Sequence, residues 1–427
     1  MSEIYCSMKE GQFVFPEIDQ NYVDPNKMAI AISGGGTRSM AASMGHMRAL
    51  RSLNPNFYEN ISYISGISGG SWFNNIFVYS NVDLDDLLGE SIPIEEISIG
   101  TLEKRNFEHN NLFMGHVLTH CPFLESFIDG HNRAGHKIFD YICGNIFLSK
   151  YGLQNRIPTL NVRYAELNHQ FNNIRCIIPS PGMPFIISTA AIIDKDADDG
   201  DIEACEFTPL YSGVRTHNHK YGGLLFNNQG FGCNFKNIDV ETHDVHTVTI
   251  NPHFGDCTLE TAMAASGAAY ATELFKLQDS ILGGILCELN PRTNVWGKNS
   301  NHDYEVILTD GTYFDYTGIL PLLARGCKKI LSFQNCDKFE GNYCAFGINH
   351  LFGVEQDFKC YGCEYRSKLQ VFHVRDWVTM REHFEHQNKR GEFLCHRAKL
   401  EVLKNTRAGV NGGYRSEERR VGKECRI

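Results

Sequence analysis

Two glycine-rich turns, each preceded by a short apolar run, restrict most strongly what this chain can fold into. The first turn follows the apolar run at residues 28–32 and reads SGGGTRSM over residues 33–40. The second follows the run at residues 61–64 and reads GISGGSW over residues 66–72. Apolar runs of this length that end in glycines are typical of buried strands, and the sequence after each turn is compatible with a helix. The pattern predicts strand, turn and helix twice in succession, which indicates an α/β fold.

The second turn matches the G-x-S-x-G pattern of a nucleophile elbow through Gly66, Ser68 and Gly70. In such an elbow the serine occupies a strained strand-to-helix turn that exposes its hydroxyl, and the flanking glycines keep other side chains away. The helix N-terminus beside the serine favours developing negative charge. We interpret Ser68 as a candidate catalytic nucleophile, although an ordinary Gly/Ser turn would give the same five-residue pattern.

The first turn contains three consecutive glycines, whose backbone N–H groups can approach a ligand as in an oxyanion hole or a phosphate cradle. The dinucleotide fingerprint G-x-G-x-x-G fails because Ser39 stands where its third glycine belongs, and the P-loop pattern fails at the same residue. The remaining interpretation is an oxyanion hole formed by Gly35 and Gly36. Arg38 follows closely enough to face an anionic group such as a phosphate.

The two turns together resemble those of the cytosolic phospholipase A2 and lysophospholipase catalytic domain, a relative of the patatin-like acyl hydrolases. The segments EFTPLY at residues 206–211 and KYG at residues 220–222 extend this resemblance, which covers about residues 28–335. It implies a three-layer α/β/α fold with a central mixed sheet. It also implies hydrolysis of fatty-acyl esters by a Ser/Asp dyad without histidine, and it predicts a catalytic aspartate far downstream at the end of another strand.

Asp310 best fits the expected downstream aspartate. It follows the strand candidate at residues 304–309 and begins the sequence Asp-Gly-Thr, where patatin-like enzymes have Asp-Gly-Gly or Asp-Gly-Ala. The carboxyl end of a strand beside a glycine turn is where a sheet-based hydrolase presents a catalytic group. Asp315 is the nearest competing acid, and a turn-capping role for Asp310 is the structural alternative. The predicted dyad is Ser68 with Asp310.

Composition restricts the partners of the chain. It has 427 residues, of which 42% are hydrophobic, and a formal net charge of −10, so the charge balance gives no sign of nucleic-acid binding. No apolar run is long enough to predict a transmembrane helix, and the first residues lack the basic and apolar regions of a signal peptide. The fifteen scattered cysteines are interpreted as mostly reduced thiols. We expect a cytoplasmic protein that acts on phospholipid or lysophospholipid at a membrane surface, to which it binds peripherally.

Neither of two candidate metal-binding segments fits a known ligand spacing. The acidic cluster at residues 194–203 departs from the calcium loop of an EF-hand, because its glycine falls one position late and Cys205 stands in place of the final glutamate. The C-x-x-C pair of Cys360 and Cys363 lacks a second pair of ligands at a recognised spacing. We therefore expect no metal and no cofactor.

One large catalytic domain is expected over residues 28–414, preceded by an irregular N-terminal arm at residues 1–27. Residues 415–427 resemble the in-frame translation of a common sequencing adapter. We interpret them as non-native and leave them out of the expected fold, with a charged disordered tail as the alternative.

Three other functions fit parts of this sequence. A patatin-like lipase acting on neutral glycerides would use the same dyad without a phosphate-binding role for Arg38. A catalytically inactive lipid-binding protein would keep the fold, although the intact Ser68, Asp310 and glycine loop argue against it. Nucleotide binding at residues 34–36 is disfavoured by both failed phosphate motifs. The leading interpretation is a phospholipase A2 or lysophospholipase.

Overall fold

A computed structural model describes both glycine-rich turns and the segment around Asp310. The described residues are 2–5, 8–9, 12–89, 93–96, 98, 137–161, 176–193, 202–216, 222, 224–228, 230–232, 247–248, 257–269, 271, 290–296, 303–335, 347–354 and 368–422. The acidic residues between 194 and 201 and the pair of Cys360 and Cys363 lie outside these ranges. The expectation that neither segment binds a metal therefore stays a prediction.

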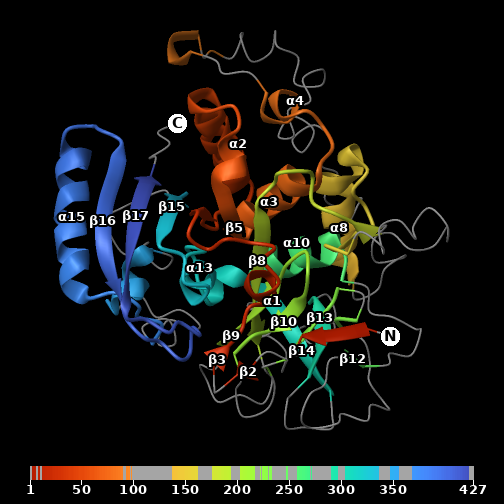
Figure 1. Cartoon of the computed structure of the whole chain (residues 1–427). Helices are drawn as coiled ribbons and strands as arrows, with labels where there is room; N and C mark the ends of the chain where they lie inside the picture. The colour runs from red at the N-terminus through yellow and green to blue at the C-terminus, as the bar shows by residue number, and fades with distance from the viewer. Residues whose placement is uncertain are drawn as a thin grey trace, which may run out of the picture.

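One large mixed sheet runs through the molecule (Figure 1). Its described strands are β1 (Ser2–Tyr5), β4 (Met28–Ile32), β5 (Ile61–Ile67), β8 (Phe185–Ile193), β9 (Ile202–Phe207), β10 (Ser212–Val214), β11 (Leu224–Phe226), β12 (Thr247–Val248), β13 (Arg292–Trp296), β14 (Asp303–Asp310), β15 (Lys329–Gln334), β16 (Leu394–Val402) and β17 (Tyr414–Gly422). The main path follows the order β12-β1-β11-β10-β9-β8-β5-β4-β15-β17-β16, and β14 joins it through β8 and carries β13. Two small separate pairs are β2 (Met8–Lys9) with β3 (Gln12–Phe13) and β6 (Ile157–Pro158) with β7 (Cys176–Ile177).

The centre of the sheet is parallel and buried. β15, β4, β5 and β8 pair in that order with the same direction. All seven residues of β5 and all nine of β8 are buried. Strands covered on both faces are nearly continuous in their apolar character, which is why the short runs before the two glycine turns were recognisable in the sequence. Both predicted strands are therefore confirmed, as β4 and β5.

Helices cover both faces of this sheet. The described α-helices are α1 (Pro16–Asp19), α2 (Gly36–Leu53), α3 (Gly69–Tyr79), α4 (Leu84–Leu88), α8 (Ile138–Cys143), α10 (Leu259–Gly267), α13 (Leu320–Ala324) and α15 (Val374–Lys389). Shorter helical segments are η1 (Phe57–Asn60), η2 (Ile94–Glu96), the π-helical η4 (Gly144–Leu148), η5 (Ser149–Tyr151), η6 (Gly311–Tyr313) and η8 (Ile348–Phe352).

Alternate residues of β4 show the two layers directly. Ile30 and Ile32 pack in a core with the buried residues of α2, α3 and α8. Ala29 and Ala31 point to the opposite face, into a core with residues of α13 and α15. Successive side chains of a strand leave it on opposite faces, so these two cores lie on the two sides of the sheet. The expected three-layer α/β/α arrangement with a mixed central sheet is confirmed.

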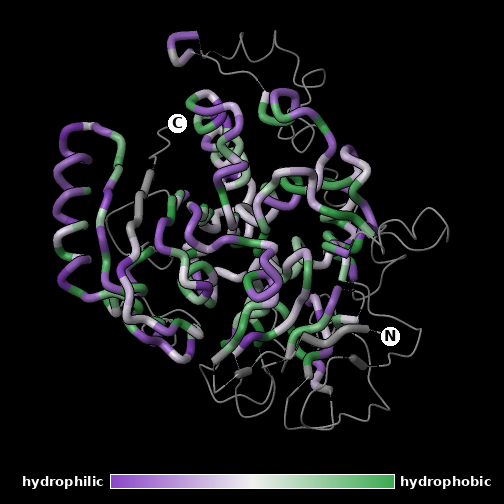
Figure 2. Tube along the Cα trace, viewed as in Figure 1, coloured by the Kyte–Doolittle hydropathy of each residue, from purple (hydrophilic) through white to green (hydrophobic). Residues whose placement is uncertain are grey.

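Hydropathy follows this layering (Figure 2). The central elements carry many hydrophobic residues, whereas α15 is largely hydrophilic and buries Met380 and Phe384 toward the sheet. Among the described residues, none of the helices combines the length and the apolar character needed to span a bilayer.

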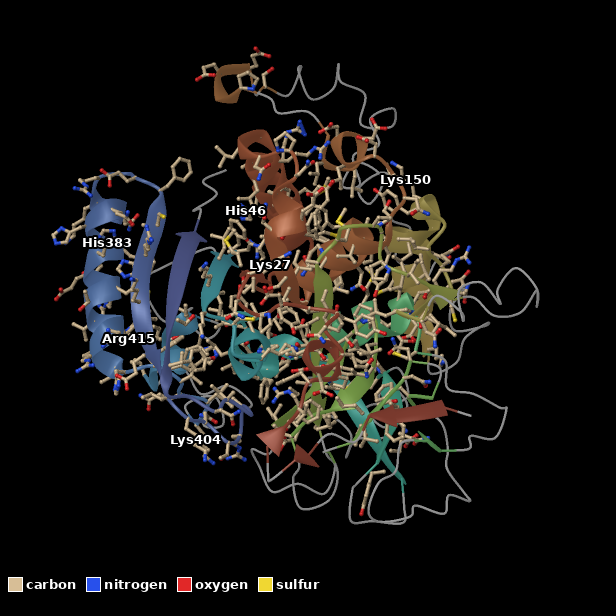
Figure 3. All side chains as sticks on the ribbon, viewed as in Figure 1. Lys27, His46, Lys150, His383, Lys404 and Arg415 are labelled. Atoms are coloured by element: carbon tan, nitrogen blue, oxygen red, sulfur yellow. The ribbon has the colours of Figure 1, made fainter. Side chains whose placement is uncertain are left out.

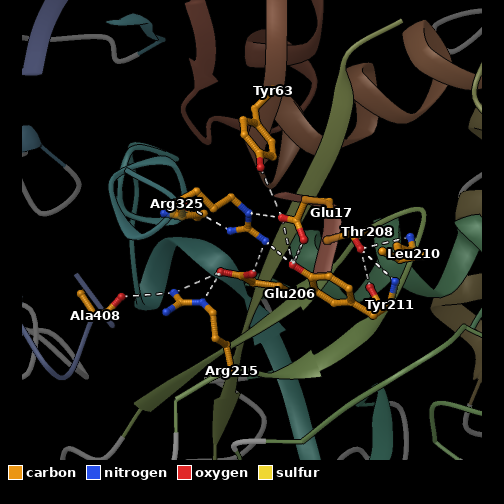
Figure 4. Close-up of polar contacts among 10 residues, drawn as sticks. Glu17, Tyr63, Glu206, Thr208, Leu210, Tyr211, Arg215, Arg325 and Ala408 are labelled. Carbon is orange, nitrogen blue, oxygen red and sulfur yellow. Dashed lines mark hydrogen bonds and ion pairs between the residues drawn. The ribbon is translucent and has the colours of Figure 1, made fainter. Parts of the chain in front are cut away.

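The N-terminal arm is more ordered than expected. Its first strand, β1, pairs with β11 and β12 and so belongs to the main sheet. Glu17 of α1 is fully buried and lies 2.7 Å from Nε of Arg325, in a cluster that Figure 4 shows. The described part of the arm thus contains regular elements, whose partners lie far along the chain and are not revealed by the local sequence.

The expected place of the C-terminal segment also needs correction. Residues Tyr414–Gly422 form β17, which pairs parallel with β15 and antiparallel with β16. Figure 3 labels Arg415 at this edge of the molecule, beside α15. The segment therefore belongs to the sheet and is not a disordered tail over those residues. Its adapter-like origin stays a prediction, which sequencing of the 3′ end of the native transcript would test.

Candidate active site

Ser68 stands at the sharp turn between β5 and α3, as the elbow interpretation predicts. Its φ of 51° and ψ of −125° place it in a region that non-glycine residues rarely adopt. Such a conformation costs about 1–3 kcal/mol and persists only where surrounding contacts hold it. A Cβ on Gly66 would lie 2.5 Å from Nδ2 of Asn74, and one on Gly70 would lie 2.8 Å from the Ile32 carbonyl oxygen. Close packing around the serine therefore requires both glycines of the pattern.

Asp310 approaches Ser68 because two strands meet end to end along one edge of β8. β5 runs parallel to β8, and its last residue, Ile67, pairs with Thr189. β14 runs antiparallel to β8, and its last residue, Asp310, pairs with Ala190. Since Thr189 and Ala190 are neighbours, the carboxyl ends of β5 and β14 face each other at one place. The expected position at the end of a strand is confirmed, and the strand that carries the acid runs opposite to β5.

The Asp310 carboxyl group is buried among neutral partners. Its side chain is 3% exposed, and Oδ1 accepts a hydrogen bond of 2.9 Å from the Thr312 N–H. Burial raises the pKa of Asp310 to about 6, against smaller opposing effects of hydrogen bonds from Thr312 and from the Ser68 side chain. A carboxylate with such a pKa is charged at pH 7 and accepts a proton more readily than an exposed aspartate does.

The glycine loop, the elbow and the Asp310 turn are in direct contact. A Cβ on Gly69 would overlap the carbonyl oxygen of Gly36. A Cβ on Gly34 would lie 3.4 Å from the Cβ of Ser68 and 2.5 Å from the Thr312 methyl carbon. Thr312, the departure from the family's Asp-Gly-Gly or Asp-Gly-Ala pattern, therefore packs against the glycine loop.

The backbone conformation of the glycine loop determines which of its N–H groups are hydrogen-bonded within the protein. Gly35 and Gly36 have φ values of 136° and 60°, which favour glycine, and α2 begins at Gly36. The Gly34 N–H donates to the Tyr316 carbonyl at 3.1 Å. Within the described part of the chain, neither the Gly35 nor the Gly36 N–H donates to a backbone or side-chain acceptor. The two N–H groups predicted for an oxyanion hole are thus available as hydrogen-bond donors.

A polar brace ties the start of this loop to the end of β15. The Asn335 N–H donates to Ser33 Oγ at 2.7 Å, and its Nδ2 donates to Ser39 Oγ at 2.9 Å. Ser39 Oγ in turn donates to the Ser33 carbonyl at 2.7 Å, and His46 on α2 lies 3.0 Å from Asn335 Oδ1. Asn335 was not among the predicted site residues, because no local signal in the sequence places it beside a loop 302 positions earlier.

Arg38 is the third residue of α2, and its side chain is exposed. The next residue, Ser39, is buried and belongs to the brace. The guanidinium group therefore lies at the surface near the glycine loop, outside the buried contact between Ser68 and Asp310.

The competing acid Asp315 and Ser71, the other serine of the elbow sequence, have structural roles. Asp315 accepts hydrogen bonds from the Thr317 and Leu320 N–H groups at 2.8 and 3.0 Å and lies 3.5 Å from Nε2 of His350. Burial opposes its ionisation, but the His350 and Thr317 contacts outweigh burial and hold the pKa of Asp315 below its usual range. Ser71 is fully buried and donates to the Ser68 carbonyl at 2.9 Å. Asp315 therefore caps the segment that follows it, and Ser71 supports the elbow.

The fold and the site define a class: α/β proteins with a serine at a strained elbow, a buried aspartate and an adjoining glycine loop. The sequence profile of the lysophospholipase catalytic domain matches residues 28–248, which is just over half of the chain. The chain belongs to the lysophospholipase catalytic domain family.

Individual relatives match shorter or more distant portions. A Saccharomyces cerevisiae protein that carries the name meiotic phospholipase SPO1 is 34% identical over 120 residues, which are 25% of this chain and 19% of that protein. Mouse cytosolic phospholipase A2 epsilon is 47% identical over 45 residues, which are 10% of this chain and 5% of that protein. Human GIVD cytosolic phospholipase A2 aligns structurally over 93% of this chain and 53% of its own, with 14% identity and a TM-score of 0.47. The matched portions thus span about half or less of each relative.

Proposed function

We propose that this protein hydrolyses fatty-acyl ester bonds of glycerophospholipids or lysophospholipids, with Ser68 as nucleophile and Asp310 as general base. The observation that carries this proposal is the end-to-end meeting of β5 and β14, which sets a strained serine against a buried carboxylate. Membership in the lysophospholipase catalytic domain family supports the same chemistry.

The proposed reaction has two halves. Asp310 takes the proton from the Ser68 hydroxyl as Oγ attacks the ester carbonyl, and the N–H groups of Gly35 and Gly36 bind the oxyanion. Collapse of the tetrahedral intermediate breaks the ester bond, and the leaving alkoxide takes the proton from Asp310. Water then attacks the acyl-Ser68 ester with Asp310 again as base, which releases the fatty acid and restores the serine.

Arg38 is proposed to select substrates with a phosphate. Its exposed side chain follows the glycine loop within α2, where a head group could meet a guanidinium while the ester lies at Ser68. The acidic chain would act as a cytoplasmic enzyme that meets its substrate at a membrane surface.

Vesicle hydrolysis tests the proposal. Purified protein is incubated with phosphatidylcholine, lysophosphatidylcholine or a neutral glyceride emulsion, and fatty-acid release is measured for the wild type, Ser68→Ala and Asp310→Asn. We expect release from a phosphate-containing substrate, and a loss of at least about 10³-fold in both variants. Release that survives Ser68→Ala in folded protein would refute the nucleophile assignment. No release from any substrate would favour a lipid-binding protein.

A matched pair of arginine variants tests the phosphate role. Arg38→Ala should reduce phospholipid hydrolysis about tenfold more than glyceride hydrolysis, because a charge-assisted contact with a phosphate contributes about 1.5–3 kcal/mol. Arg375→Ala, at an exposed arginine of α15, serves as the control for lost surface charge. Equal losses on both substrates would indicate a lipase for neutral glycerides.

A further inference from the structure

A second serine contacts the backbone of the nucleophile residue. Ser266, in the last turn of α10, is fully buried. Its Oγ accepts a hydrogen bond of 3.0 Å from the backbone N–H of Ser68 and donates one of 2.7 Å to the carbonyl of Thr189. Both the donor and the acceptor capacities of this hydroxyl are thus used by backbone groups at the site.

These two contacts fall where the site is assembled. Thr189 pairs with Ile67, the residue before the nucleophile, and precedes the residue of β8 that pairs with Asp310. The Ser266 hydroxyl therefore links the elbow to the one point of β8 at which both strand ends arrive. Moving this hydroxyl would change the position of Ser68 relative to Asp310.

The helix that carries Ser266 is itself held against the elbow helix. Trp72 Nε1 donates to the Met263 carbonyl at 2.9 Å, one turn before Ser266. A Cβ on Gly267 would overlap the Trp72 indole, so α10 approaches α3 as closely as a glycine allows. The small residues at positions 264–269 thus let α10 pack closely enough for the Ser266 hydroxyl to reach the backbone of Ser68.

The hydrogen bond to Ser266 also bears on the strained backbone of Ser68. A buried N–H without an acceptor is unfavourable, so the elbow would relax toward a conformation that satisfies it. With Ser266 as acceptor, the positive φ of Ser68 and a satisfied N–H are compatible. The same contact removes this N–H from the groups that could face a substrate oxyanion.

We infer that Ser266 is a positioning residue, which holds the Ser68 backbone so that its hydroxyl faces Asp310. This inference rests on the proposed function, since it assigns Ser266 a role in the reactivity of Ser68. Ser266 acts through the backbone of Ser68, and its described hydrogen bonds go to the Ser68 N–H and the Thr189 carbonyl, not to Asp310. Its loss should therefore slow the attack by Ser68 without changing the pH at which Asp310 titrates.

The test measures the nucleophile alone. An alkyl fluorophosphonate reacts covalently with an activated serine, with fluoride as leaving group, and the mass of the labelled peptide identifies the residue. The second-order rate constant and the final labelled fraction are measured for the wild type, Ser266→Ala, Ser266→Cys and the control Ser43→Ala. Ser43 is equally buried in a helix, and its hydroxyl donates to the Ser39 carbonyl at 2.6 Å.

We expect Ser266→Ala to lower the rate constant about 10²-fold, because misplacement of reacting groups by about 1 Å has effects of this size. The labelled fraction should still reach that of the wild type, and the midpoint of the pH profile should not move. Ser266→Cys, which keeps a weak donor and acceptor of similar size, should fall in between. Ser43→Ala should react like the wild type.

The outcomes separate the two proposals. If wild-type Ser68 is not labelled, the proposed function fails, whatever the Ser266 variants do. If wild-type Ser68 is labelled and both folded Ser266 variants react at its rate, the positioning role is wrong. A lower labelled fraction with an unchanged rate constant would show a loss of folded protein only and would also overturn the inference. Should Ser266→Ala fail to fold, the rate constant of Ser266→Cys decides.

Discussion

Two buried carboxylates in this molecule, Asp310 and Glu206, have opposite surroundings. Glu206 of β9 is 1% exposed and accepts from Arg325 Nη2 at 2.8 Å and from Arg215 Nη2 at 3.2 Å (Figure 4). Burial alone would raise its pKa, but the two guanidinium groups outweigh burial and hold the pKa of Glu206 below its usual range. Asp310 is buried to a similar degree, and its described partners are neutral.

The difference indicates how a structural carboxylate is distinguished from a reactive one. A carboxylate that neutralises buried cations stays charged and takes no part in proton transfer at ordinary pH. A carboxylate buried among neutral donors has its pKa raised toward neutrality, which suits a general base. The comparison therefore predicts that substitutions at the two sites affect stability in opposite directions.

The largest expected effect is the loss of Arg325. Its guanidinium group contacts Glu17 and Glu206 at 2.7 and 2.8 Å and lies 4.5 Å from the centroid of the Phe15 ring. Arg325→Met would remove the cation that joins Glu17 and Glu206 and leave Glu206 with Arg215 alone, so it should lower the free energy of unfolding by about 3–5 kcal/mol. Urea unfolding at pH 7 measures this change.

An exposed arginine provides the control for Arg325. Arg381 of α15 pairs with Glu385 at 2.8 Å on the surface, and Arg381→Met should cost less than about 1 kcal/mol. Similar losses of unfolding free energy for the two variants would show that burial of the Glu17–Glu206–Arg325 cluster adds nothing to stability. The contrast between Glu206 and Asp310 would then lose its basis.

Asp310→Asn should instead increase the free energy of unfolding. The pKa of Asp310 rises from 3.8 to about 6 on folding, so the charged form destabilises the folded state above about pH 6. Asparagine has nearly the same shape and no charge, so the free energy of unfolding at pH 8 should increase by on the order of 2–3 kcal/mol. Below about pH 4 the aspartate is protonated in both states and this gain should vanish.

Glu206→Gln is the matched variant for Asp310→Asn. It also removes a buried carboxylate charge, but it leaves Arg325 and Arg215 with less compensation, so the free energy of unfolding should fall at pH 8. Unfolding curves at pH 4 and pH 8 for both variants give four values. Destabilisation by Asp310→Asn at pH 8 would contradict the assignment of a raised pKa.

The pH dependence of Ser68 reactivity tests the raised pKa of Asp310 through the proposed reaction. As a base, Asp310 must be unprotonated, so the rate of fluorophosphonate labelling should fall about tenfold per pH unit below about pH 6 and level off above it. Labelling rates between pH 4.5 and 8 measure the midpoint. A midpoint near 4 would mean that Asp310 behaves as an ordinary exposed aspartate, and the distinction from a paired carboxylate would lose its basis.

The sequence predicted the parts of this site that depend on local backbone packing. Gly66 and Gly70 flank Ser68 because side chains there would collide with neighbouring atoms, and such requirements leave a fixed spacing in the sequence. Asp310 was predicted because the family resemblance implies a downstream aspartate and because it ends a strand candidate, before a glycine. The direction of its strand, and the end-to-end meeting with β5 on β8, have no local signal because strand pairing is a tertiary property.

Contacts between distant segments were beyond prediction for the same reason. Asn335 and Glu17 each contact partners far along the chain, and neither was among the predicted site or core residues. The charged residues after position 414 show no alternating or apolar pattern that predicts a strand. The pairing of β17 (Tyr414–Gly422) with β15 and β16 is made by backbone groups of distant strands, which the composition of the segment does not reveal.

The smallest expected effect lies within the Glu17–Glu206–Arg325 cluster, where a neutral hydroxyl joins the charges. The Tyr211 hydroxyl donates to Glu17 Oε2 at 3.0 Å and accepts from Arg325 Nη2 at 2.7 Å. Tyr211→Phe should lower the free energy of unfolding by about 1–1.5 kcal/mol and leave Ser68 labelling unchanged. Tyr63→Phe is the control, because its hydroxyl lies 3.5 Å from Glu17 and so contributes less. If Tyr211→Phe instead slowed labelling with little change in stability, the cluster would be coupled to the reaction, and the division between a structural and a reactive carboxylate would have to be redrawn.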